Sequence, residues 1–223
     1  MHSVNKRWTL IDKSILSMLP CLDDADPCYY YLVRSPGGYS ASFANSRIED
    51  FKKNPERYRD NPAVWRYKLA EIQNFADDIA RLLNNPGLAK VIADFQPVAI
   101  TAMPTSKPKS DPYHDSRIDD LCAEVTKRVA GIGWASPFDV SARISPSHLN
   151  GPRDVATLEA SLSFNGFGKE PGLVFLVDDV LTTGAHFTAC RNIIRRHHPS
   201  VPIIGVFLCI HRSDYRDWSK IGL

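Results

Sequence analysis

Two adjacent carboxylates near the end of the chain are the residues best suited to binding or chemistry. Asp178 and Asp179 directly follow an apolar run at residues 173–177. Ionised carboxylates only accept hydrogen bonds, so the pair can hold two vicinal hydroxyl groups, such as the 2′ and 3′ hydroxyls of a ribose. We therefore expect Asp178 and Asp179 to bind a ribose and to be the catalytic carboxylates of a reaction at this point.

The residues that follow the pair have the composition of a phosphate-binding loop that leads into a helix. Threonine hydroxyls and the unpaired amides of a helix N-terminus donate hydrogen bonds to an anion, and the helix dipole favours it. Glycine permits a positive φ angle at such a turn. The same composition also fits a plain strand-to-helix turn with capping side chains. The candidate phosphate-binding residues are Val180, Leu181, Thr182, Thr183, Gly184 and Ala185.

Apolar runs alternate with amphipathic segments around this loop. Spacings of three and four predict a helix over residues 118–129 and another after Gly184. The alternation predicts an α/β fold with a mostly parallel sheet flanked by helices. In such a sheet, ligands bind beyond the carboxyl ends of the strands, which is where this loop would lie. The predicted strands cover residues 98–103, 138–140, 173–177 and 203–210.

The first 90 residues indicate a mostly helical N-terminal extension, and residues 91–223 the ligand-binding domain. Ser46 and Glu49 form a capping box that would open a short helix. Asn61 and Pro62 would open a long helix that ends at residues 84–87. Its expected buried stripe consists of Trp65, Leu69, Ile72, Ala76, Ile79 and Leu83.

The connection over residues 141–172 has weak periodicity and is long for a compact domain. We expect it to be a lid with glycine hinges at residues 151–152 and 166–172. The alternative is a fixed helix over residues 155–162 that packs on the sheet.

Residues 177–185 resemble the phosphoribosyl-pyrophosphate-binding motif of type I phosphoribosyltransferases. That motif is a hydrophobic strand, two acidic residues, two apolar residues and then Thr-Thr-Gly or a similar triplet. The resemblance implies a type I phosphoribosyltransferase-like fold that binds phosphoribosyl pyrophosphate. It also implies transfer of the phosphoribosyl group to an acceptor with release of pyrophosphate, and Mg²⁺ bound mainly through the pyrophosphate of the ligand.

In that family, the loop after the first sheet strand binds pyrophosphate, and residues 103–109 occupy the same place here. Thr105, Ser106, Lys107 and Lys109 supply hydroxyls and positive charge suited to a pyrophosphate. The alternative is a solvated loop with ordinary surface lysines. Further on, the segment 114–117 could contact pyrophosphate or an acceptor, or simply cap the next helix.

The order of elements over residues 98–210 is similar to that of the ComF-like group, which is associated with competence. ComF-like proteins commonly begin with a four-cysteine zinc module that this chain lacks, and residues 111–117 stand where Arg-Gly-Phe-Asn-Gln is usual. The alternative function is therefore a non-catalytic sensor or subunit for phosphoribosyl pyrophosphate or a nucleotide, in a competence or antiphage assembly. Homodimerisation or assembly with other proteins is the expected form of partnership.

Composition limits the partners and the cellular compartment that can be expected for the protein. The net charge of +2 does not indicate a nucleic-acid partner, because no strong positive field follows from it. The five cysteines are scattered and odd in number, which favours a reducing compartment over a disulfide framework. No apolar run is long enough to span a membrane, so we expect a cytoplasmic protein that uses no membrane.

Overall fold

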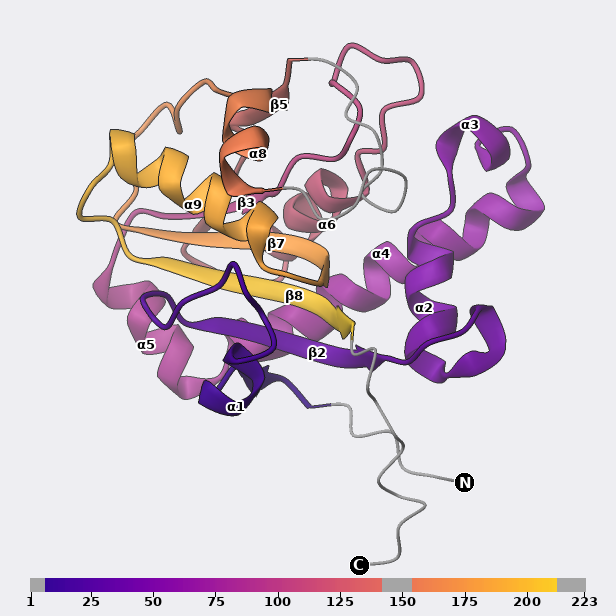
Figure 1. Cartoon of the computed structure of the whole chain (residues 1–223), viewed down its shortest axis with the longest axis horizontal. Coiled ribbons are helices and arrows are strands. Elements are labelled where there is room, and N and C mark those ends of the chain that lie inside the picture. Colours follow the sequence, from indigo (N-terminus) through magenta and orange to yellow (C-terminus); the bar gives the residue numbers. More distant parts are fainter. Residues whose placement is uncertain (1–6, 142–153, 212–223) are drawn as a thin grey trace, which may run out of the picture.

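A computed structural model describes residues 7–141 and 154–211 of the chain (Figure 1). Its centre is a six-stranded sheet in the order β1-β2-β8-β7-β3-β4. All neighbouring strands are parallel except β1, which pairs with β2 in the antiparallel sense. The strands of this sheet are β1 (Thr9–Leu10), β2 (Cys28–Arg34), β3 (Val98–Ala102), β4 (Ile132–Ala135), β7 (Leu173–Leu181) and β8 (Ile203–His211).

Helices cover both faces of the sheet, so the expected α/β fold with a mostly parallel sheet is confirmed. One hydrophobic core joins α2, α4, α5 and α6 to side chains such as Ile100 and Phe175. A second core joins α1 and α9 to the opposite face through Val174 and Leu176. The helices are α1 (Lys13–Leu16), the 3-10 helix η1 (Tyr39–Ala41), α2 (Phe43–Phe51), α3 (Pro55–Tyr58), α4 (Pro62–Leu83), α5 (Pro86–Asp94), α6 (Arg117–Thr126), α8 (Val155–Ser161) and α9 (Ala185–His197).

Strand β7 is longer than the sequence indicates. It runs four residues past Val177, because β8 continues beside it and pairs Asp178 with Phe207 and Leu181 with Ile210. The expectation that a loop begins at the acidic pair is therefore wrong. Asp178 and the next residue lie within the last part of a sheet strand, and the turn to α9 is only three residues long.

The first 90 residues contribute strands as well as helices. Strand β2 lies between β1 and β8 and runs parallel to β8. Its sequence, with three consecutive tyrosines followed by leucine and valine, has the aromatic and β-branched content of a strand. The boundary near residue 90 stays a prediction, but the residues on both sides of it share one sheet and one core.

Two helix starts differ in how they are capped. Helix α4 begins at Pro62 after Asn61, as expected, but the Asn61 side chain makes no capping hydrogen bond. Helix α2 begins earlier than the capping box at Ser46 suggests, because the Ser42 side chain accepts a hydrogen bond from the backbone N–H of Asn45 at 3.0 Å. Ser46 therefore lies inside the helix.

The region expected to be a lid is described only from residue 154 onward, and the predicted hinge at 151–152 lies outside the described residues. Helix α8 packs against α9, where Leu158 contacts Ala185 and Ala189. Strand β6 (Leu162–Phe164) then pairs antiparallel with β5 (Phe138–Val140) in a separate two-stranded sheet. The part of the region that is described is therefore a helix packed on another helix, close to the alternative of a fixed helix.

Candidate functional site

The two candidate loops leave the sheet at the same edge. Strands β3 and β7 are parallel neighbours, with Ala102 opposite Val177. The backbone N–H of Met103 donates to the carbonyl of Val177 at 2.8 Å, just where β3 ends. The loop over residues 103–109 therefore begins beside Val177, and the turn after β7 begins five residues further along that strand. Both follow the carboxyl ends of parallel strands, where ligands bind in such a sheet.

The turn between β7 and α9 is built around one glycine. Gly184 has φ +84°, which favours glycine, and a Cβ at this position would lie 2.8 Å from the Cβ of Leu22. The carbonyl of Thr183 accepts a hydrogen bond from the backbone N–H of Cys21 at 3.0 Å. Residues 21–22 thus hold the turn from one side and fix its conformation.

The hydroxyl groups of the turn differ in their surroundings. Thr182 is exposed, whereas Thr183 is half-buried. The Thr183 Oγ1 accepts a hydrogen bond from the backbone N–H of Ala185 at 3.3 Å, which leaves its own proton available to an acceptor. With the N-terminal amides of α9 behind them, the two threonines present donors to the solvent side of the turn.

Asp179 is buried and fully engaged in ion pairs. Its Oδ2 accepts from Arg117 Nε at 3.0 Å and Nη2 at 2.5 Å, and its Oδ1 lies 3.3 Å from Lys52 Nζ. The side chain is only 7% exposed. Burial alone would raise the pKa of Asp179, but the charges and hydrogen bonds of Lys52 and Arg117 outweigh it and hold the pKa well below its usual value.

Asp178 has more open surroundings. Its side chain is 18% exposed and its Oδ2 lies 3.4 Å from Nδ1 of His186, in the first turn of α9. Its Oδ1 accepts from the backbone N–H of Asp179 at 2.8 Å. Of the two carboxylates, Asp178 is the one beside the helix N-terminus and the turn.

The ion pairs of Asp179 belong to a larger group that we call the carboxyl-edge cluster: Lys52, Lys68, Asp115, Arg117 and Asp179. Lys68 is 2% exposed and donates from Nζ to Asp115 Oδ1 at 2.6 Å and to the carbonyl of Lys53 at 2.8 Å. Burial lowers the pKa of Lys68 to about 8. The cluster itself holds three cations against two carboxylates, and Asp178, next to Asp179, is a further carboxylate at this edge of the sheet.

The lysines of the loop after β3 are both held by protein groups. Lys107 Nζ lies 3.0 Å from Glu56 Oε2, and Lys109 Nζ donates to the Ser136 carbonyl at 3.0 Å. Among the described residues, the buried Thr105 Oγ1 has no hydrogen-bond partner. Ser106 is exposed. The loop therefore offers the Ser106 hydroxyl directly, the buried Thr105 hydroxyl only after it becomes accessible, and its lysines only after they exchange partners.

Lys52 and Lys68 come from the first 90 residues, and sequence reasoning did not identify them. Lys68 precedes Ile72 by four residues, so it occupies the buried stripe of α4, where a lysine is unusual. Leu69, expected in that stripe, is 50% exposed. A lysine at a buried position was the signal in the sequence, because it requires a buried acidic partner.

Two further properties concern metal binding and membrane-spanning helices. Among the described residues, no group of three or more His, Cys, Asp or Glu side chains could hold a metal ion. A Mg²⁺ ion can be held by one or two carboxylates together with ligand phosphates, and Asp178 is the open carboxylate at this edge. In the described ranges, no helix has the length and apolar character needed to cross a membrane.

Comparisons with known proteins gave few matches. No family model matches the chain, and no curated protein matches it. Two solved structures, both of a hypoxanthine phosphoribosyltransferase from Staphylococcus aureus, are similar to it. The orthorhombic form is 16% identical over 65% of this chain and 68% of that chain, with a TM-score of 0.33. The tetragonal form is 12% identical over 64% and 73%, with a TM-score of 0.31.

Proposed function

We propose that the chain binds phosphoribosyl pyrophosphate at the carboxyl edge of its sheet and transfers the phosphoribosyl group to an acceptor, with release of pyrophosphate. The observation that carries this proposal is the junction of β7 and α9. An acidic pair lies two residues before the end of β7, a glycine-containing turn follows the strand, and a helix N-terminus comes at once after the turn. This arrangement supplies acceptors for ribose hydroxyls and donors for a phosphate within one short segment.

In this proposal the 5′-phosphate binds at the turn. Thr182 and Thr183 donate from their hydroxyls, and the backbone from Gly184 to Ala185 approaches the phosphate closely. Val180 and Leu181 are the end of β7 and position the turn. The extra positive charge of the carboxyl-edge cluster favours the anionic ligand through a medium of low dielectric constant.

The two carboxylates take different parts in the proposal. Asp178 accepts from the ribose hydroxyls, because it is the partly exposed member beside the turn. Asp179 positions Arg117 and Lys52 through its ion pairs. This division refines the expectation that both carboxylates contact the ribose.

The pyrophosphate end of the ligand is assigned to the loop after β3. Thr105 and Ser106 donate to it, and Lys107 exchanges Glu56 for the pyrophosphate. Lys109 remains on Ser136 or joins the ligand. Mg²⁺ would be held mainly by the pyrophosphate, with Asp178 as the protein carboxylate within reach of the site, and would neutralise charge on the leaving group.

The chemistry needs little beyond positioning and charge. Cleavage of the bond between C1′ and the pyrophosphate oxygen leaves positive character on the ribose, and the acceptor then forms its bond to C1′. The chain's residues hold the ribose by its hydroxyls and phosphate while the donors of the β3 loop stabilise the departing pyrophosphate.

A second candidate function is a non-catalytic sensor or subunit that binds the same ligand or a nucleotide. It is favoured by the state of the β3 loop, where both lysines already have protein partners. Such a protein would bind the ribose phosphate at the turn and leave the pyrophosphate unreacted.

Pyrophosphate release distinguishes the two. The full chain is incubated with phosphoribosyl pyrophosphate, Mg²⁺ and each of a series of nucleobases, and pyrophosphate is measured over time. Release that depends on one base and is lost in Asp178→Asn supports the transferase. Binding of phosphoribosyl pyrophosphate without release supports the sensor. Absence of binding contradicts the transferase and a sensor of phosphoribosyl pyrophosphate.

A further inference from the structure

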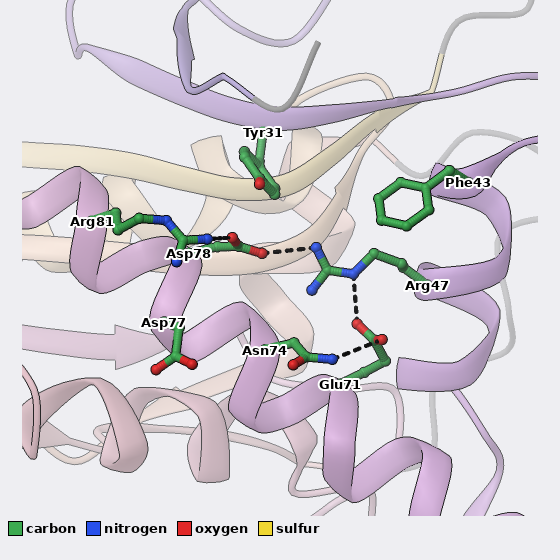
Figure 2. A pocket seen from close by; sticks show the side chains of 8 residues that line it. All are labelled: Tyr31, Phe43, Arg47, Glu71, Asn74, Asp77, Asp78 and Arg81. Atoms are coloured by element: carbon green, nitrogen blue, oxygen red, sulfur yellow. Dashed lines mark hydrogen bonds and ion pairs between the residues drawn. The ribbon is translucent and has the colours of Figure 1, made fainter. Parts of the chain in front are cut away.

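A pocket apart from the carboxyl-edge cluster is lined by residues of α2, α4 and β2. It encloses about 320 Å³ between these helices and β2, and it shares no lining residue with the carboxyl-edge cluster (Figure 2). The residues that decide its chemistry are Tyr31, Arg47, Glu71, Asn74, Asp77 and Asp78.

Arg47 is the central group of this pocket. Its side chain is 9% exposed, Nε bonds Glu71 Oε2 at 2.7 Å, and Nη1 bonds Asp78 Oδ2 at 2.8 Å. Its third nitrogen, Nη2, is buried and has no hydrogen-bond partner among the described residues. In Figure 2 this nitrogen lies on the side of the guanidinium group nearer to Asn74. The guanidinium carbon lies 3.9 Å from the ring centre of Phe75. A buried charged donor without an acceptor is costly, so an acceptor supplied by a ligand would complete the site.

The charges of the pocket exclude a strongly anionic ligand. Its walls carry the carboxylates of Glu71, Asp77 and Asp78 against the guanidinium groups of Arg47 and Arg81. The lining has one more carboxylate than guanidinium group, and Asp77 pairs with Arg128 at 2.7 Å. A phosphate placed against Arg47 would face Glu71 and Asp78, which Arg47 already pairs. A strongly anionic ligand is therefore excluded, and an uncharged one with an acceptor for Arg47 and donors for the carboxylates fits these walls.

Aromatic side chains complete the description of the ligand. Tyr31 is 5% exposed and its ring stacks on Trp8 with centroids 5.1 Å apart, so the ring is held in place at one wall. Phe43 lies at the start of α2, on the other side of Arg47 (Figure 2). Aromatic faces and edges favour a planar ring.

We propose that this pocket binds an uncharged planar heterocycle that carries a carbonyl oxygen next to a ring N–H, the edge that uracil and hypoxanthine share. The carbonyl accepts from Arg47 Nη2, and the neighbouring N–H donates to the carboxylate of Glu71, which Arg47 Nε holds alongside. The site is distinct from the proposed ribose-phosphate site and does not depend on it.

The test compares two ligands of nearly the same shape. Binding of uracil and of 1,3-dimethyluracil to the full chain is followed by ligand-detected NMR and calorimetry. Both carry the carbonyl acceptors, but only uracil has N–H donors. We expect uracil to bind about tenfold more tightly or better, because the carboxylate otherwise loses its hydrogen bond. Equal affinity, or no binding of uracil at millimolar concentration, would overturn the proposal.

Variants locate the binding and separate it from the carboxyl-edge site. Asn74 is exposed on α4, so Asn74→Trp fills the pocket without disturbing the core, and Lys90→Trp on α5 is the matched exposed control. Uracil binding should be lost in the first and unchanged in the second. Arg47→Lys, which keeps a charge and loses the third nitrogen, should weaken binding about tenfold. Its thermal melting curve would show whether it folds, and unchanged affinity in Asn74→Trp would contradict the assignment whatever the lysine variant does.

Uridine and uridine 5′-monophosphate test whether the bound ring can belong to a nucleoside or to a nucleotide. Uridine should bind like uracil, since the same edge is free. The monophosphate should bind more weakly because of the three carboxylates. A monophosphate that binds more tightly than uridine would mean that the pocket recognises phosphate, and the proposal would fail.

Discussion

The carboxyl-edge cluster and the Arg47 pocket are two groups of charges built on the same pair of helices, and they differ in what they leave unpaired. In the cluster, Lys52, directly after α2, and Lys68 from α4 join Arg117 against two carboxylates, and one positive charge remains within the cluster. In the pocket, Arg47 from α2 meets carboxylates from α4, and one negative charge remains. Two sites with opposite surplus suit two different ligands, a phosphate at the first and an uncharged ring at the second.

The acidic pair also shows that burial, more than residue type, decides whether a carboxylate can bind a ligand. Asp178 and Asp179 are neighbours of the same type, yet one lies beside the turn and the other is enclosed by cations. A carboxylate inside a buried cluster stabilises the fold by neutralising its partners, whereas a partly exposed one can exchange water for a ligand. The predictions below separate these roles, beginning with the largest expected effect.

The strongest test of the difference within the acidic pair is stability. Asp179→Asn leaves Lys52 without its carboxylate partner and Arg117 with Asp115 alone, and should cost about 3–5 kcal/mol of unfolding free energy. Asp178→Asn, at a partly exposed site, should cost less than about 1 kcal/mol. Urea unfolding followed by circular dichroism measures both. Equal losses would mean that the two carboxylates have the same surroundings.

The cluster should also respond to pH through Lys68. Burial lowers its pKa to about 8 from an ordinary 10.5, so between these values the unfolded chain binds more protons than the folded one. The unfolding free energy should therefore rise with pH across this range, by on the order of 3 kcal/mol. The quantity to measure is the difference in unfolding free energy between the natural chain and Lys68→Met. The pH-dependent contributions of the other titratable residues cancel in this difference. A difference that stays flat from pH 8 to 10.5 would contradict the assignment.

The turn that binds the phosphate in our proposal depends on Gly184. Gly184→Ala combines a positive φ with a Cβ 2.8 Å from Leu22 and should cost about 2 kcal/mol or more of stability. Gly166 is the matched control, since it has φ +77° but no atom within 4 Å of an added Cβ. Gly166→Ala should cost only the backbone strain, about 1 kcal/mol. If thermal denaturation gives the same loss for both, residues 21–22 do not hold the turn.

The smallest expected effect concerns the lysine of the β3 loop. Lys107→Ala should weaken phosphoribosyl pyrophosphate by about 1.5 kcal/mol and leave ribose 5-phosphate nearly unchanged, because only the first carries pyrophosphate. Glu56→Gln removes the group that now holds Lys107 and should strengthen binding slightly. Calorimetric titration of both ligands checks this. An equal loss for the two ligands in Lys107→Ala would place this lysine away from the pyrophosphate.

Much of the fold could be predicted because its strands are strongly apolar. Local sequence patterns are visible in the apolar runs of β3, β7 and β8 and in the Asn-Pro start of α4. These patterns were sufficient to predict the α/β class. Strand β2 was missed because tyrosine-rich segments lack a clear period. The length of β7 was missed because two adjacent aspartates interrupt its apolar run, and pairing with β8 keeps them and the next two residues in the sheet.

The candidate site could be predicted only in part. The turn after β7 is contiguous in sequence, so its phosphate-binding composition is visible there. The ion pairs of Asp179 join residues 62 and 127 positions away along the chain, and such distances leave no local pattern. Without them, the acidic pair looks like two equivalent ligands, which the structure shows to be in unequal surroundings.

The central claim is that a ribose phosphate binds at the end of β7 through Asp178. Its most direct test is calorimetric titration of phosphoribosyl pyrophosphate with Mg²⁺ into the natural chain, Asp178→Asn and Asp94→Asn, the last an exposed carboxylate on α5. We predict binding to the natural chain and to Asp94→Asn, and a loss of affinity of about tenfold or more in Asp178→Asn. Equal affinity in all three proteins, with each shown to be folded, would contradict the claim.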